Sequence, residues 1–303
     1  MGFEFVSLSL PPLLIGICVA VACAIPGNFL LLRQQALIGD AISHVILPGI
    51  VLAFVLTGSL ASPVMLAGAA IAAAVAMIAI ELTRRLGRIE PGAAMGVIFT
   101  AMFAAGVLML EQFDTSGVHL DVEHALYGNL EGLIWLDALG WSSLLDPSAL
   151  ATLPPELPRM ALVLGGIALF TWVFWRPLSL TTFDEGFAQA IGLKTGWLGI
   201  ALVILSAIAA VAAFDAVGSI IVIAMFICPP AAARLMTNRL GAQVALSAAL
   251  AAFSAVLGYV LAGYGPIWLG YSASLSAAGM IATVSGLILA GAAIFGTHRT
   301  RAS

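Results

Sequence analysis

The feature that most constrains this chain is a succession of apolar stretches, each about as long as a lipid bilayer is thick. A helix needs about 20 apolar residues to cross a hydrocarbon core of ~30 Å. Any one of these stretches could be a half-span, so the sequence predicts an all-α, polytopic membrane protein with eight or nine transmembrane helices. The stretches cover residues 10–32, 41–60, 63–81, 91–110, 160–175, 197–214, 216–234, 241–263 and 274–296.

The composition leaves no room for a large soluble domain. Hydrophobic residues make up 62% of the chain and charged residues 9%, whereas soluble domains carry about 25% charged residues. We therefore interpret residues 1–303 as a single transmembrane domain. The only lysine is Lys194, and no basic patch could follow a phosphate backbone, so we expect no nucleic-acid partner.

One apolar run, residues 197–234, is too long for a single crossing of the bilayer. It must break, and the stretch 213–218, Ala-Phe-Asp-Ala-Val-Gly, is the obvious place. A break there places Asp215 at a membrane surface, where a charge costs little free energy.

Charge is distributed unevenly between the polar intervals. Residues 111–159 form one long acidic interval, whose interior could be an interfacial or re-entrant helix. The positive-inside rule assigns this interval to the outside and the short basic loops and the tail to the cytoplasm. If all nine stretches cross, the N-terminus lies outside. The basic residues of these short loops and of the tail are Arg84, Arg85, Arg88, Arg176, Lys194, Arg234, Arg239, Arg299 and Arg301.

Asp40 and His44 stand four residues apart in an otherwise apolar run. On a helix they share one face, and a charged group there costs about 2.5–3.5 kcal/mol on insertion scales. A carboxylate and an imidazole make two ligands for a divalent cation, and suit Mn(II), Fe(II) or Zn(II) better than Cu(I). The alternative is a pair at the membrane boundary, with Asp40 as the N-cap of the second span.

A second candidate metal-binding segment lies in the acidic interval. His119, Asp121, Glu123 and His124 place four potential ligands within six residues, which would suit capture of a metal on the outer surface. The alternative is a solvated helix start, with Asp121 near the N-cap and acidic residues in the first turn.

Residues 181–192 predict a short amphipathic helix in the loop 177–195, which we place in the cytoplasm. Thr182 and Glu185 have the spacing of a capping box, and Gly192 stands where a helix would terminate. The helix could rest on the spans or the lipid surface, or dock into a partner protein. Its apolar face would comprise Phe183, Phe187, Ala190 and Ile191, with Asp184 and Glu185 on other faces.

The chain lacks the G-x-x-x-x-G-K-[ST] pattern that binds nucleotide phosphates. If ATP drives transport, a separate chain hydrolyses it, and this chain is not an enzyme. Three other classes compete with this interpretation. An ion-coupled secondary metal transporter would be expected to have inverted repeats, and we detect none. An intramembrane enzyme would need a catalytic set that only Asp40 and His44 could supply, and a scaffold would need neither residue.

Several stretches together resemble one known family, the metal-ion ABC-3 permeases, which are membrane subunits of ABC importers for manganese, zinc and iron. The matching stretches are GDAISHVILPG, DVEHALYGNL, FDEGFAQAIGLKTG, AVGSIIVIAMFICPPAAARL and the tail AGMIATVSGLIL. The resemblance covers nearly the whole chain. The form of the fourth stretch and of the tail looks more like the manganese and iron branch than the zinc branch.

The resemblance implies a type II ABC importer-like permease in the cell (inner) membrane. Asp40 and His44 would be transient ligands of the transported metal, with no cofactor bound stably. The implied partners are an ABC ATPase, an external metal-binding protein that delivers the ion, and a second permease chain, identical or a sister. The segment 183–193 would be the coupling helix that docks into the ATPase, through Phe183, Asp184, Glu185, Phe187, Ile191 and Gly192.

Overall fold

The computed structural model describes residues 5–35, 38–58, 62–112, 130–138, 140–268, 270 and 275–296, and in these the chain is helical with no strand. The predicted all-α fold is confirmed. The long helices are α2 (Leu10–Leu32), α3 (Ile38–Thr57), α4 (Ser62–Gly87), α5 (Pro91–Gln112), α8 (Glu156–Val173), α11 (Thr195–Val217), α12 (Ser219–Met236), α13 (Leu240–Trp268) and α14 (Ala277–Phe295). Shorter elements are η1 (Phe5–Ser9), η2 (Leu130–Gly132), η3 (Trp141–Leu145), α7 (Pro147–Leu150), α9 (Trp175–Phe183) and α10 (Glu185–Ala190).

The long helices coincide with the apolar stretches of the sequence. Among the described residues, eight helices are long and apolar enough to cross a membrane, and α3 contributes a shorter apolar portion, Pro48–Thr57. This agrees with the eight or nine spans predicted. Helix α4 continues to Gly87, past the end of its apolar stretch, so Arg84 and Arg85 lie on its last turns.

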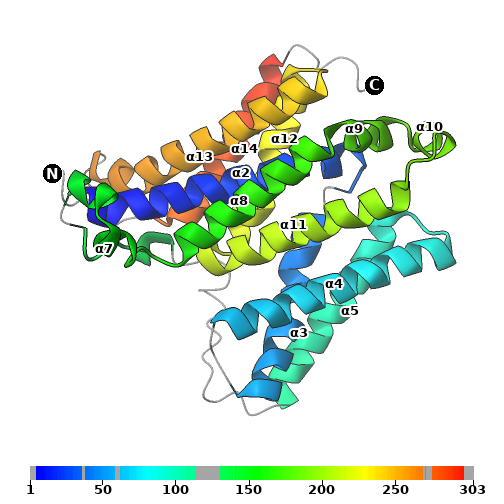
Figure 1. Ribbon diagram of the computed structural model, residues 1–303, viewed down its shortest axis with the longest axis horizontal. Coiled ribbons are helices and arrows are strands. Elements are labelled where there is room, and N and C mark those ends of the chain that lie inside the picture. Colours follow the sequence, from blue (N-terminus) through cyan, green and yellow to red (C-terminus); the bar gives the residue numbers. More distant parts are fainter. Residues whose placement is uncertain are drawn as a thin grey trace.

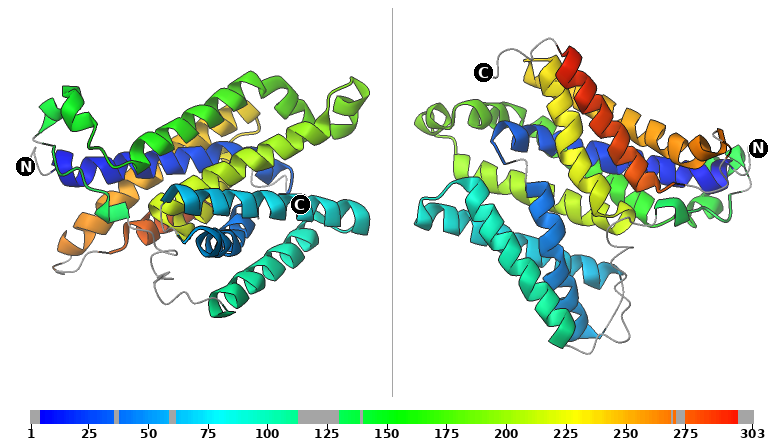
Figure 2. Two further views of the ribbon diagram at one scale, coloured as in Figure 1. Left: turned by 60° about the horizontal axis from the view of Figure 1, so that its bottom comes forward. Right: turned by 180° about the vertical axis from the view of Figure 1, so that it is seen from behind.

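The helices are arranged around α2, which contacts α8, α11, α12 and α13 (Figures 1 and 2). Helices α3, α4 and α5 form a separate layer beyond α11 (Figure 1). The α4–α5 turn and α10 lie at the right of Figure 1, while η1 and α7 lie at the left. The basic turns therefore gather at one end of the bundle, and the described part of the acidic interval at the other.

The centre of the bundle is mostly apolar, with a polar cluster around Asn28. Asn28 is fully buried and its Nδ2 donates to Ser247 Oγ at 2.6 Å. Gln243 Nε2 donates to Asn28 Oδ1 at 3.1 Å. The cluster joins α2 to α13 by side-chain hydrogen bonds, which stabilise helix pairs in a low-dielectric interior.

The long apolar run breaks where predicted. Helix α11 ends at Val217 and α12 begins at Ser219, with only Gly218 between them. The φ angle of Gly218 is +77°, in the region that a residue with a Cβ rarely adopts. The side chain of Asp215 lies outside the described residues, so its position at a membrane surface stays a prediction.

The described residues between α5 and α8 contain only short helical turns, and no helix long enough to cross the bilayer. This part packs on the start of α2: Trp135 is buried, and its backbone N–H donates to Ser7 O at 2.8 Å. Its indole Nε1 donates to Ala149 O at 2.9 Å. The described portion is therefore a compact cover at this end of the bundle.

Candidate functional site

Helix α3 contains both predicted pathway ligands. Asp40 and His44 lie one turn apart within Ile38–Thr57, as their spacing predicts. Because the helix begins at Ile38, Asp40 lies inside the first turn, and the alternative in which it is the N-cap is wrong. The two side chains lie outside the described residues, so their pairing around a metal stays a prediction.

The segment of α3 that follows Asp40 packs closely on α4. Ala41 and Val45 are buried. At Gly49 the two backbones touch: an added Cβ would lie 2.3 Å from Gly68 O, and one on Gly68 would lie 2.4 Å from Gly49 O. Only glycine fits at both positions. Pro48 has no N–H to donate to the carbonyl of His44, which therefore loses its usual helical partner.

The second candidate segment, with His119, Asp121, Glu123 and His124, falls in residues 113–129, outside the described residues. Its role as a capture site therefore stays a prediction. Within the part of the chain that the structure does describe, no group of three or more His, Cys, Asp or Glu could hold a metal ion.

The predicted amphipathic helix is present as α10, but it begins differently. Asp184 is the N-cap, and its Oδ1 accepts a hydrogen bond from Phe187 N–H at 2.8 Å. The predicted capping box of Thr182 and Glu185 is wrong, because α9 continues to Phe183 and Thr182 lies within it. Its hydroxyl donates to Leu178 O at 2.7 Å instead. The predicted loop 177–195 is thus largely helical.

Gly192 ends α10 as predicted. Its φ angle is +85°, its N–H donates to Gln189 O, and the N–H of Leu193 donates to Ala188 O, which is a Schellman motif. Ala188 is buried, so α10 rests on the bundle by one side. The predicted apolar face is exposed at Phe183, Phe187, Ala190 and Ile191.

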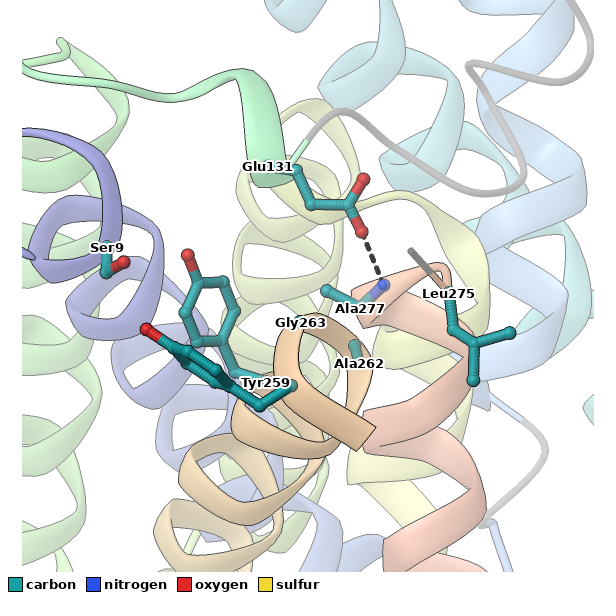
Figure 3. A pocket seen from close by; sticks show the side chains of 8 residues that line it. Ser9, Glu131, Tyr259, Ala262, Gly263, Leu275 and Ala277 are labelled. Atoms are coloured by element: carbon teal, nitrogen blue, oxygen red, sulfur yellow. Dashed lines mark hydrogen bonds between the residues drawn. The ribbon is translucent and has the colours of Figure 1, made fainter. Parts of the chain in front are cut away.

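The hydrogen bonds of Arg33 and of Glu131 were not predicted from the sequence. Arg33, directly after α2, donates hydrogen bonds to the end of α9. Glu131 of η2 accepts a hydrogen bond from the N–H of Ala277, the first residue of α14 (Figure 3). This carboxylate at a helix N-terminus is favoured by the helix dipole.

Glu131 also borders a pocket of about 260 Å³ at the end of the bundle that carries the acidic interval. In Figure 3, Ser9 and Tyr259 lie across the pocket from the bonded Glu131 and Ala277. The carboxylate already accepts the hydrogen bond from the first residue of α14, and this hydrogen bond joins η2 to the bundle. It is lined by Ser9, Glu131, Tyr259, Ala262, Gly263, Tyr264, Leu275 and Ala277.

The fold is that of a multi-pass membrane protein, with an exposed amphipathic helix at one end of the bundle and a carboxylate and an imidazole on one apolar helix. These features define the class of membrane transport subunits. The chain belongs to the ABC 3 transport family, whose model matches residues 6–139 and 147–296.

Known relatives are similar along most of the chain. It is 36% identical over 280 residues to a manganese transport system membrane protein, MntD, of Bacillus subtilis, covering 92% of this chain and 89% of that protein. It is 35% identical over 286 residues to a zinc transport system membrane protein, TroD, of Treponema pallidum, covering 93% and 72% of the two chains.

Solved structures have the same fold. The chain matches one of PsaBC from Streptococcus pneumoniae in complex with Fab, with a TM-score of 0.73 and 25% identity, over 96% of this chain and 92% of that one. An inward-facing metal-chelate type ABC transporter matches with a TM-score of 0.67 at 15% identity, which supports the fold alone. The predicted permease family and fold are confirmed.

Proposed function

We propose that this chain is the membrane permease of an ATP-driven importer that carries a divalent metal ion into the cytoplasm. The observation that carries the proposal is the Asp40–His44 pair, one turn apart on helix α3 of a chain in the ABC 3 transport family. A charged pair in an apolar helix is costly, so it needs a function such as binding a cation in transit. Two ligands bind weakly enough to release the ion, which transport requires.

Mn(II) is the metal that we propose, with Zn(II) and Fe(II) as the alternatives. One carboxylate and one imidazole suit all three ions. The relative at 36% identity is named for manganese, and a relative at 35% identity is named for zinc. The stretch 216–235 resembles the manganese and iron branch.

The importer needs other chains. An external binding protein would deliver the ion, and a second permease chain would complete the coordination that Asp40 and His44 leave incomplete. A separate ATPase would dock on the exposed apolar side chains of α10 and its flanks, which are Phe183, Phe187 and Ile191. The assembly would reside in the cell (inner) membrane, with α10 on the cytoplasmic side.

The test is metal uptake by cells from which the gene for this chain has been deleted and which carry the wild-type or variant gene on a plasmid. Wild-type chain should restore accumulation of radioactive manganese, whereas the Asp40→Ala, His44→Ala double variant should reduce it by about tenfold or more, because ligand loss weakens metal binding by at least that factor. A Glu90→Ala variant, which changes a carboxylate in the α4–α5 turn, serves as the control.

Membrane levels of each variant are measured alongside uptake. Full uptake by the double variant at normal membrane level would remove the pair from the pathway. Uptake that persists in vesicles without ATP or partner chains would favour the secondary transporter. Preferred accumulation of zinc or iron would keep the permease but replace the metal.

A further inference from the structure

Arg33 connects the end of α2 to the end of α9. It is the C-cap of α2, and its Nη2 donates to Thr181 Oγ1 at 2.7 Å. Its Nε donates to Thr182 Oγ1 at 3.2 Å. One planar guanidinium thus holds two neighbouring hydroxyls, which a single ammonium cannot do in the same geometry. These three residues are called the Arg33 clamp below.

The clamp is a partly buried charge at the basic end of the bundle. Burial lowers the pKa of Arg33, and the nearby carboxylate of Glu185 opposes that shift. Arginine still keeps its charge at physiological pH. An added Cβ on Gly199 would lie 3.6 Å from Arg33 Nη1, so the guanidinium lies between α9 and α11. Hydrogen bonds from a charged donor are stronger than neutral ones.

On one side, the clamp holds the base of the segment 183–192. Thr181 and Thr182 directly precede Phe183, and Asp184 is the N-cap of α10. A displacement of α10 therefore reaches the two hydroxyls through only Phe183 and Asp184, the residues between Thr182 and α10.

On the other side, the clamp holds the turn that leads into α3. Gln34 has a φ angle of +58°, its N–H donates to Leu31 O at 3.1 Å, and Gln35 N–H donates to Leu30 O at 2.8 Å. This Schellman motif fixes the direction in which the chain leaves α2. Helix α3, with Asp40 and His44, begins at Ile38.

The two helix ends that the clamp joins also share an aromatic contact. The rings of Phe29 on α2 and Trp175 on α9 meet edge to face, with centroids 6.1 Å apart. Phe29 is fully buried. The end of α2 thus contacts α9 near both of its ends, at Trp175 and at the two threonines, so a displacement of α9 reaches Arg33.

We propose that Arg33 is a positioning residue that transmits the displacement of segment 183–192 to the turn before α3, and so couples ATP use to metal release. The proposal rests on the function proposed above. Arg33 stands outside both the predicted ligand pair on α3 and the predicted coupling segment 183–193, and it acts through the threonines on one side and through the Gln34 turn on the other.

The test uses the chain assembled with its ATPase and second permease chain in proteoliposomes supplied with the external binding protein, where ATP hydrolysis and manganese uptake are both measured. Arg33→Ala should leave the assembly and ATP hydrolysis largely intact while uptake falls by about tenfold, within the usual range of coupling between sites. The number of ions moved per ATP therefore falls. Arg33→Lys should recover part of that ratio. Arg176→Ala, at an exposed arginine of α9, should leave it unchanged.

The Thr181→Val, Thr182→Val double variant tests the same contact from the other side. It removes both acceptors at nearly constant shape, and should lower the ratio as Arg33→Ala does. If uptake and hydrolysis fall in parallel in either variant, the number of ions per ATP is unchanged, the clamp is a structural anchor and the proposal is overturned. Uptake and hydrolysis that both stay at the wild-type level would overturn it as well. Wild-type vesicles that hydrolyse ATP without moving metal would instead refute the proposed function.

Discussion

Helices α2 and α5 are both long and apolar, but they occupy very different surroundings. Within an 18-residue apolar window of the span Phe5–Leu32, 56% of the residues are buried inside the protein, against 17% in the span Gly92–Met109 of α5. Figure 1 shows α2 at the centre of the bundle and α5 at the edge of the α3–α5 layer. Apolar composition alone therefore does not distinguish a central helix from one that faces lipid or a second chain.

The two regions are also held together by different interactions. The central region uses directional contacts: the hydrogen bonds of Asn28 to Ser247 and Gln243, and the edge-to-face rings of Phe29 and Trp175. The α3–α5 layer instead uses the backbone contact of Gly49 and Gly68. Contacts between small residues gain their stability from close van der Waals packing.

The difference bears on how easily each helix can shift. To move α2, buried hydrogen bonds must break in a low-dielectric interior, which is costly. At Gly49 and Gly68, sliding α3 on α4 exchanges van der Waals contacts between the two backbones. The Gln34 turn stands between the end of α2 and the helix that carries Asp40 and His44.

The largest expected effect comes from filling the contact between α3 and α4. Gly68→Leu places a side chain against the backbone of Gly49, so α3 must move. We expect uptake to be lost and the free energy of unfolding to fall by about 1–3 kcal/mol, the usual cost of overpacking. Metal uptake and unfolding in detergent check the two effects.

The control for this variant is Gly96→Leu in the same layer. An added Cβ on Gly96 meets no atom within 4 Å, so the same change of size should leave the fold of the chain intact. If Gly68→Leu transports as well as Gly96→Leu, the glycine contact does not position α3, and the comparison of the two regions fails.

Much of the fold follows from the sequence, because membrane helices are encoded locally. The break within 213–218 was predicted from the length of the apolar run, and the end of α10 at Gly192 from glycine as a helix terminator. Gly218, where the run breaks, and Gly192 both have a positive φ angle. The pair on α3 was also visible, because Asp40 and His44 are near neighbours in the chain. Their side-chain geometry, and the segment 113–129, remain predictions.

The errors arose where distant residues decide local structure. Thr182 has the spacing of a capping residue, but it lies within α9. Its hydroxyl donates to Leu178 O and accepts a hydrogen bond from Arg33, 149 positions earlier. Asp184 is also the more favourable N-cap by residue type, because Asp is preferred over Thr at that position. Glu131 was missed for the same reason, since its partner Ala277 lies 146 positions later.

A second, smaller effect should follow from Asn28→Leu, which tests the central region. The variant keeps the side-chain volume but removes the partner of Ser247 and Gln243. Buried polar groups left unpaired cost about 1–3 kcal/mol in soluble proteins, whereas hydrogen bonds between membrane helices average about 0.6 kcal/mol. We expect a loss near 1 kcal/mol, measured by unfolding in detergent.

Ser206→Ala provides the comparison, because the hydroxyl of this buried serine on α11 donates to its own helix, at Leu202 O. It should destabilise the protein less than Asn28→Leu does. Equal stability of wild type and Asn28→Leu would mean that the cluster adds no rigidity, and the contrast between the two regions would then rest on the aromatic contact alone.

The smallest expected effect lies at the joint between the regions. Gln34 adopts a left-handed conformation, which costs a residue with a Cβ about 1–2 kcal/mol, while glycine loses about 0.5–1 kcal/mol more entropy on folding. Gln34→Gly should therefore stabilise the protein by roughly 1 kcal/mol or less, seen as a higher unfolding midpoint. Gln35→Gly, one position later and without a positive φ angle, should not stabilise it.

Uptake should be little changed by Gln34→Gly, because the Arg33 clamp still holds the turn. If uptake falls while stability rises, the strain at Gln34 itself positions α3, and the joint rather than the clamp separates the rigid region from the helix that shifts.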